Sequence, residues 1–110
     1  MELRKVTAII RSHLLDKVEE HLQQMGVKGL SVSHVKGYGE YANFFTHNWL
    51  VRHTKIEIFA EKTRAESIAR AIMDVAHTGG PGDGLIALQP VEKIYRIRTK
   101  AEATPEEMES

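Results

Sequence analysis

The hydrophobic residues of this chain change their spacing twice, and this change limits the available folds more than any other feature of the sequence. Residues 3–10 alternate side chains between two faces and are rich in β-branched residues, which is typical of a β-strand. Residues 14–25 carry apolar side chains three and four positions apart, and Gly26 follows where such a helix ends. The same change recurs between residues 55–62 and residues 63–77, so each half of the chain predicts a strand followed by a helix.

Each of these strand–helix pairs is followed by a further strand. Residues 30–35 and residues 85–91 have the composition of strands, although we expect Pro90 to interrupt the second one. The order is therefore βαβ, a long loop, and βαβ. It predicts an α+β, ferredoxin-like βαββαβ fold, in which an antiparallel sheet carries two helices on one face. Because this fold serves many functions, the function has to be sought in the connections between elements.

Length and composition indicate one small domain. The chain has 110 residues, of which 42% are hydrophobic and 27% are charged, an ordinary globular balance. We expect residues 1–100 to form this domain, with a loop at about residues 38–54. Residues 101–110, "AEATPEEMES", are mostly polar and include four glutamates, so we expect a flexible acidic tail.

Charge and cysteine content argue against several classes of protein. The 15 basic and 15 acidic residues give a formal net charge of +0, which argues against a nucleic-acid partner held by a basic surface. The absence of cysteine excludes disulfides and thiolate zinc sites, and it fits a reducing compartment. No apolar run approaches the roughly 20 residues of a membrane span. We therefore expect a cytoplasmic protein.

The stretch "TGGPGDG", residues 78–84, concentrates four glycines and a proline after the second expected helix. Such a stretch commonly serves as a turn between two elements. It also allows backbone N–H groups to close around an anion such as a phosphate. Both interpretations remain open from these residues alone.

Five segments in a fixed order resemble the PII signal-transduction family of nitrogen and carbon regulators. They are "TAIIR", "LDKVEEHLQQMGVKGLSVSHVKGYGE", "KIEI", "TGGPGDG" and "YRIRT", and the resemblance covers residues 3–99. It implies a homotrimer with an adenine nucleotide in each cleft between neighbouring subunits, and a signalling loop after the second strand that meets a partner protein. It also implies a regulator rather than an enzyme, and the sequence shows no positioned nucleophile, carboxylate pair or metal-bound base.

The resemblance also assigns nucleotide-binding roles to individual positions. In the family, a glycine loop contacts the phosphates, two arginines reach them from the neighbouring subunit, two glycines lie at the base of the signalling loop, and two residues surround the adenine. The phosphate loop matches Thr78, Gly82, Asp83 and Gly84, and the two arginines match Arg96 and Arg98. The glycines at the base of the signalling loop match Gly37 and Gly39, and the residues around the adenine match Ser31 and Glu57.

Three of these positions have a second interpretation. Strand alternation would place Arg96 and Arg98 on one face of an extended segment, where they could grip phosphates. They could equally pair with Glu92 or with carboxylates of a neighbour. Glu57 could be a simple solvent-facing residue of its strand.

The sequence departs from the family at three positions around the expected phosphates. Leu85 replaces a lysine that contacts the distal phosphates, and Glu40 replaces an arginine that also contacts phosphate. Tyr41 replaces a glutamine that joins the magnesium involved in 2-oxoglutarate binding. Since the contacts to a triphosphate are the ones lost, we expect ADP or AMP to be favoured over ATP. Relatives linked to inorganic carbon suggest bicarbonate as a second ligand and a transporter or an enzyme as the partner.

The long loop carries aromatic residues and histidines that have alternative interpretations. Its aromatic side chains could form a partner surface, or they could fold back onto the trimer. Three histidines on or beside the loop could bind zinc, copper or nickel, as in relatives associated with metal efflux, but their spacing matches no standard metal motif. The aromatic residues are Tyr41, Phe44, Phe45 and Trp49, and the histidines are His34, His47 and His53.

Overall fold

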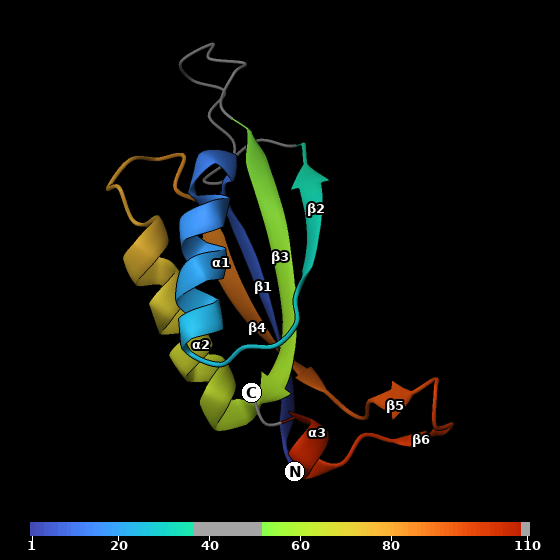
Figure 1. The fold of residues 1–110 in the computed structure, drawn as a ribbon. Helices are drawn as coiled ribbons and strands as arrows, with labels where there is room; N and C mark the ends of the chain where they lie inside the picture. The colour runs from blue at the N-terminus through green and yellow to red at the C-terminus, as the bar shows by residue number, and fades with distance from the viewer. Residues whose placement is uncertain (37–51, 109–110) are drawn as a thin grey trace.

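A computed structural model describes residues 1–36 and 52–108 of the chain (Figure 1). The elements are β1 (Leu3–Arg11), a 3₁₀ turn (Ser12–Leu14), α1 (Leu15–Gln24), β2 (Ser31–Val35), β3 (His53–Glu61), α2 (Lys62–Ala76), β4 (Leu85–Val91), β5 (Tyr95–Arg96), β6 (Ala101–Glu102) and α3 (Pro105–Met108). The loop expected at residues 38–54 ends earlier than predicted, because His53 and Thr54 already pair with β1 as part of β3.

The four main strands form one antiparallel sheet in the order β2-β3-β1-β4. Helices α1 and α2 cover the same face of this sheet (Figure 1). The predicted α+β, ferredoxin-like βαββαβ fold is therefore confirmed. Because β1 is central, Val6 lies opposite Ile58 on one side and Leu88 on the other, and this register places apolar residues of three strands beneath the helices.

The core lies between the sheet and the two helices. Strand alternation turns every second residue of β1 and β3 toward the helices, which meet them with apolar positions at helical spacing. Each large aliphatic side chain buried in this way contributes about 1.5–3 kcal/mol to folding. The core residues include Val6, Ala8, Ile10, Val18, Leu22, Ile56, Ile58, Ile68 and Ile72.

Pro90 does not interrupt β4. It lies opposite Arg4 in the β1–β4 pairing, and the strand continues to Val91. The expectation of a break was wrong because β4 is an edge strand. A proline is tolerated at an edge, where its missing N–H need not face a second partner strand.

The end of the chain is ordered over residues 101–108, so the expectation of a flexible tail does not describe them. β5 and β6 form a small hairpin that projects from the main sheet, and α3 follows it (Figure 1). Ala103 and Met108 are buried with Leu3 in a small second core. These two apolar side chains give the acidic segment enough buried surface to stay folded.

A capping box begins α3. The Thr104 N–H donates to Glu107 Oε1 at 3.0 Å, and the Glu107 N–H donates to Thr104 Oγ1 at 3.3 Å. Pro105 occupies the first helical position, where its missing N–H costs nothing. Threonine followed three positions later by glutamate was the sequence signal for this helix, and it was hidden within an acidic segment.

Candidate functional site

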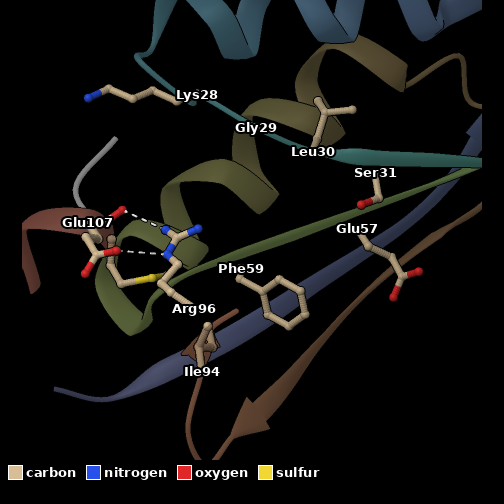
Figure 2. Close-up of a pocket in the computed structure, with 10 residues that line it drawn as sticks. Lys28, Gly29, Leu30, Ser31, Glu57, Phe59, Ile94, Arg96 and Glu107 are labelled. Atoms are coloured by element: carbon tan, nitrogen blue, oxygen red, sulfur yellow. Dashed lines mark hydrogen bonds and ion pairs between the residues drawn. The ribbon is translucent and has the colours of Figure 1, made fainter. Parts of the chain in front are cut away.

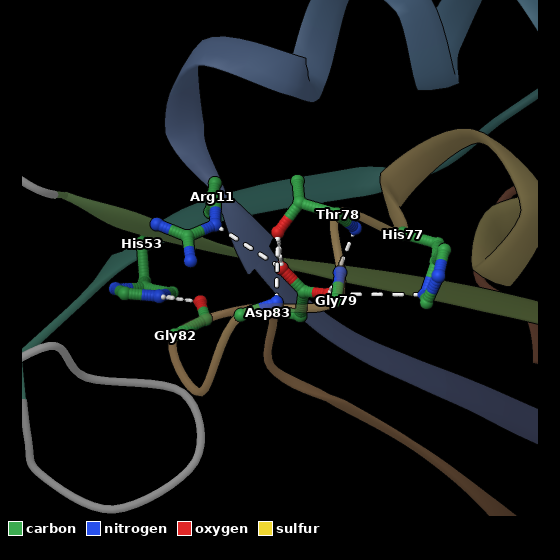
Figure 3. A network of polar contacts seen from close by, with 8 residues as sticks. Arg11, His53, His77, Thr78, Gly79, Gly82 and Asp83 are labelled. Carbon is green, nitrogen blue, oxygen red and sulfur yellow. Dashed lines mark hydrogen bonds and ion pairs between the residues drawn. The ribbon is translucent and has the colours of Figure 1, made fainter.

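The glycine-rich loop is organised around the carboxylate of Asp83 (Figure 3). Its Oδ2 accepts the backbone N–H groups of Thr78 and Gly79, each at 2.8 Å. Its Oδ1 accepts the Thr78 hydroxyl and the Nε–H of Arg11, the latter at 3.3 Å. The loop therefore already holds an anion, which is supplied by its own chain.

Two glycines of this loop lie in close contacts, and glycine is required at position 84. Gly84 has φ +105°, and a Cβ at this position would lie 1.8 Å from the Ile9 carbonyl oxygen. Gly82 lies against the guanidinium of Arg11, and a Cβ there would approach its Nη2 atom at 3.0 Å. The first contact packs the loop onto β1, and the second packs it onto the arginine.

Arg11 is a member of this site that the sequence analysis missed. It ends β1, its side chain is 14% exposed, and its ion pair with Asp83 joins the central strand to the loop. The signal was present in "TAIIR", where a basic residue ends a strand. No role could be given to it before the register showed that the end of β1 adjoins the start of β4.

Two histidines complete the surroundings of the loop. The ring of His53 is 4% exposed, and its Nε2 lies 2.7 Å from the Gly82 carbonyl oxygen. Since a carbonyl oxygen only accepts, Nε2 carries the proton in this contact. His77 Nδ1 lies 3.9 Å from Asp83 Oδ2 and is largely exposed.

The environment of Asp83 favours its charged form. Burial raises the pKa of this carboxyl, but hydrogen bonds from the Thr78 hydroxyl, the Thr78 and Gly79 N–H groups and Arg11 outweigh burial. The pKa is therefore held well below its usual range, and Asp83 remains a carboxylate at neutral pH.

A cavity of about 420 Å³ extends from the middle of β3, where Glu57 pairs with Thr7, toward the opposite end of the sheet (Figure 2). It is bordered by the start of β2, the open face of β3, the segment leading into β5, and α3. Its lining combines charged side chains with an exposed phenyl ring, a combination that suits a ligand with an aromatic part and an anionic part. The lining residues include Lys28, Ser31, Glu57, Phe59, Arg96 and Glu107.

Ser31 and Glu57 lie opposite each other in the β2–β3 pairing, and both line this cavity. Glu57 is also ion-paired, at 3.1 Å from Lys5 and 3.7 Å from Lys55. The hydrogen bond from Lys5 is the main cause that lowers the pKa of Glu57. Glu57 is thus an ion-paired residue of the sheet surface that also lines the cavity, and its role near an adenine stays a prediction.

Arg96 and Arg98 are placed differently from each other. Arg96 lies in β5, and its Nε is 3.0 Å from Glu107 Oε2 (Figure 2). Arg98 lies in the turn between β5 and β6 and is exposed. The expected extended segment with both arginines on one face is absent, because the chain turns back at residues 97–100. Arg96 was expected to pair with Glu92 as an alternative to phosphate, but its carboxylate partner in the structure is Glu107 of the tail.

The glycine loop and the cavity that contains Arg96 do not meet within one chain. The loop adjoins Arg11 at the end of β1, whereas the chain reaches Arg96 from Val91, which lies opposite Leu3 at the start of β1. The nine residues of β1 separate these two ends by roughly 25 Å. A ligand that contacts both the glycine loop and Arg96 of one chain would have to span this distance.

Several predicted positions lie outside the described residues. They are Gly37, Gly39, Glu40, Tyr41, Phe44, Phe45, His47 and Trp49. Within residues 1–36 and 52–108, no three potential ligand side chains converge on a metal position. Of the two described members of the histidine trio, His53 is engaged with Gly82, and His34 lies exposed in β2. In the same part of the chain, no helix combines the length and the apolar character needed to span a bilayer.

The sheet order and the helices on one face define the class of this protein, an α+β domain of the ferredoxin-like type. Residues 3–101 match the family described as Nitrogen regulatory protein P-II. A Nitrogen regulatory protein P-II of Azospirillum brasilense is 38% identical over 107 residues, which cover 88% of this chain and 93% of the relative. A solved structure described as Arabidopsis thaliana PII bound to citrate superimposes with a TM-score of 0.77 at 31% identity, covering 98% of this chain and 92% of that one.

The chain belongs to the P-II family of nitrogen regulatory proteins. A second relative, from Rhizobium meliloti (strain 1021), is 36% identical over the same length. P-II proteins are regulatory signal-transduction proteins that form trimers and bind small ligands and target proteins. The resemblance read from the five sequence segments is thereby confirmed.

Proposed function

We propose that this protein is a trimeric regulator that binds an adenine nucleotide in the clefts between its subunits and favours ADP or AMP over ATP. The observation that carries the proposal is the separation of the glycine loop, at one end of β1, from Arg96, beyond the other end. Ser31 and Glu57 line the cavity between them, level with Thr7 in the middle of β1. In a trimer two different surfaces of neighbouring subunits meet, and we propose that the glycine loop of one subunit faces the cavity of the next.

The two clusters supply complementary parts of such a site. The cavity offers the phenyl ring of Phe59 and polar groups of Ser31 and Glu57 to a base, and it offers a guanidinium to a phosphate. At the glycine loop, Asp83 already occupies the N–H groups of Thr78 and Gly79. A phosphate is therefore expected on the Gly82–Gly84 side of the loop, beside the Arg11 guanidinium.

The preference for fewer phosphates rests on Leu85. This residue follows Gly84 directly, begins β4 and is 41% exposed. It presents an apolar side chain where a cation would otherwise face the distal phosphate. The negative charge of each added phosphate is therefore balanced by less positive charge here than at a site with a lysine.

The signal would leave the protein through the loop at about residues 38–54, toward a transporter or an enzyme, without catalysis by this chain. We further propose inorganic carbon as the regulated system, with bicarbonate as a second ligand. Binding of a small anion has a parallel in the similar Arabidopsis protein, which is described as bound to citrate.

Isothermal titration of AMP, ADP and ATP, with and without bicarbonate and magnesium, tests the proposal. The wild-type protein is expected to bind ADP or AMP more tightly than ATP, and bicarbonate is expected to change that affinity. In L85K, the added cation should improve ATP binding about fivefold relative to ADP, as expected for one partly exposed charge pair. Failure of the wild type to bind any of the three nucleotides would overturn the proposal.

Q89K is the matched control for L85K. Gln89 is an exposed residue of β4 on the same face as Leu85, four positions further along the strand. It adds the same charge at a distance from the glycine loop. If both variants improved ATP binding equally, the effect would be one of net charge, and Leu85 would have no part in the preference.

A further inference from the structure

We propose that Glu107 is an internal competitor for the ligand's phosphate, so that the folded tail lowers the affinity of the cleft for nucleotides. The proposal rests on the function proposed above, because it concerns the guanidinium of Arg96 in that same cavity. It adds an affinity-determining residue that lies in the C-terminal tail.

Glu107 occupies the side of Arg96 that a phosphate would use. Arg96 Nε lies 3.0 Å from Glu107 Oε2, and Arg96 Nη2 donates to the Glu107 carbonyl oxygen at 3.5 Å (Figure 2). Carboxylate and phosphate oxygens bind a guanidinium in the same way, through charge-assisted hydrogen bonds. While Glu107 holds these donors, they are not available to a ligand.

The fold fixes the competing carboxylate in place. The capping box with Thr104 orients the Glu107 side chain, and the adjacent Met108 is buried against Leu3. The Ala103 N–H donates to the Ile94 carbonyl oxygen at 2.8 Å, which ties the tail to the segment that leads into Arg96. Glu107 is therefore presented to Arg96 by packing and does not depend on a chance encounter of two surface chains.

The contact is also weak enough to be displaced. The Arg96 side chain is 46% exposed and that of Glu107 is 34% exposed, so water screens their attraction. Lys28 adds a second cation to the cavity lining, and an incoming dianionic phosphate interacts with both cations. Such a competitor reduces the apparent affinity by the fraction of time that Arg96 is occupied, without closing the site.

The experiment is calorimetric titration of ADP into the wild type, E107Q and E106Q. Glutamine at position 107 keeps an oxygen that can accept the Thr104 N–H, so α3 retains its cap while the competing charge is lost. E107Q should bind ADP about fivefold more tightly than the wild type, the scale of one exposed ion pair. E106Q removes an equal charge from the neighbouring exposed residue and should change the affinity by much less.

T104V supplies a second, independent variant. It removes the hydroxyl that caps the Glu107 N–H, so it loosens α3 while leaving the carboxylate in the chain. It is expected to tighten ADP binding in the same direction as E107Q. Pyrophosphate, titrated into the same variants, should show the same order if the competition concerns the phosphate and not the base.

The outcomes separate this inference from the proposed function. If the wild type binds ADP and E107Q binds it equally well, the competition is overturned and the nucleotide site stands. If E107Q binds ADP less well, Glu107 positions Arg96 for the ligand, which also overturns the competition. If neither the wild type nor any variant binds ADP, the proposed function fails and the competition fails with it.

Discussion

Each end of the sheet carries an arginine that is paired with a carboxylate of the same chain, and the two pairs differ in how much of the fold depends on them. Arg11 and Asp83 are 14% and 21% exposed, and the carboxylate also accepts two backbone N–H groups and a hydroxyl. Arg96 and Glu107 are 46% and 34% exposed, and the segment that carries Glu107 buries two apolar side chains, Ala103 and Met108.

The difference shows how one chemical pair serves two purposes. Removal of Asp83 would leave the part-buried guanidinium of Arg11 without its carboxylate, which is costly. Removal of Glu107 would return an exposed arginine to water, which costs little. The first pair is thus suited to hold a loop in one shape, and the second is suited to give way to a ligand.

The largest expected effect on stability comes from Gly84, the last residue of the glycine-rich loop. G84A should destabilise the protein by about 3 kcal/mol, since it combines a positive φ with a Cβ that overlaps the Ile9 carbonyl oxygen. Urea unfolding at fixed protein concentration measures this. G79A is the control, because Gly79 also has a positive φ, +91°, but faces open space. It should cost only about 1 kcal/mol. Equal losses in the two variants would mean that the close approach to β1 is unimportant.

The next effect concerns the carboxylate of the loop. D83N should destabilise the protein by about 2 kcal/mol at neutral pH, because an amide cannot replace the charge-assisted bonds to Arg11 and to the backbone. Urea unfolding again provides the measurement. D74N, which changes an exposed carboxylate on α2, should stay within about 0.5 kcal/mol of the wild type.

The dependence of this loss on pH has a definite sign. Because the pKa of Asp83 is lowered in the folded protein, the unfolded chain binds its proton first as the pH falls. The stability that Asp83 contributes is therefore fully present above the ordinary aspartate pKa of about 3.9, and it is lost progressively below that value. The difference between wild type and D83N should shrink on acidification. A difference that grew instead would contradict the assigned hydrogen bonds.

The contrast between the two ends also explains what the sequence could and could not predict. The glycine loop was recognisable because glycine spacing and the pattern of the following strand are local signals. The role of Asp83 as the loop's own anion was not recognisable, since it depends on Arg11, 72 positions away in the chain. Periodicity predicted the four main strands and both long helices, because each buries one regular face against the core.

The tail shows why local polarity misled the prediction. "AEATPEEMES" is mostly polar, yet Ala103 and Met108 find a second core at Leu3, and only the register of β1 brings Leu3 to that place. The alternation of Arg96 and Arg98 failed for a related reason. The chain turns at residues 97–100, where Lys100 adopts φ +57°. This segment contains no glycine, so its turn had no signal in the sequence.

The smallest expected effect lies at the tail, and it sharpens the comparison most. E107Q should leave the urea midpoint of the whole protein unchanged within error, because its ion pair is exposed and lies outside the main core. Hydrogen exchange should nevertheless rise at the Ala103 and Glu107 amides, whose bonds hold the tail in place. A loss of global stability as large as that of D83N would mean that both pairs support the fold, and Arg96 would then not be readily released to a ligand.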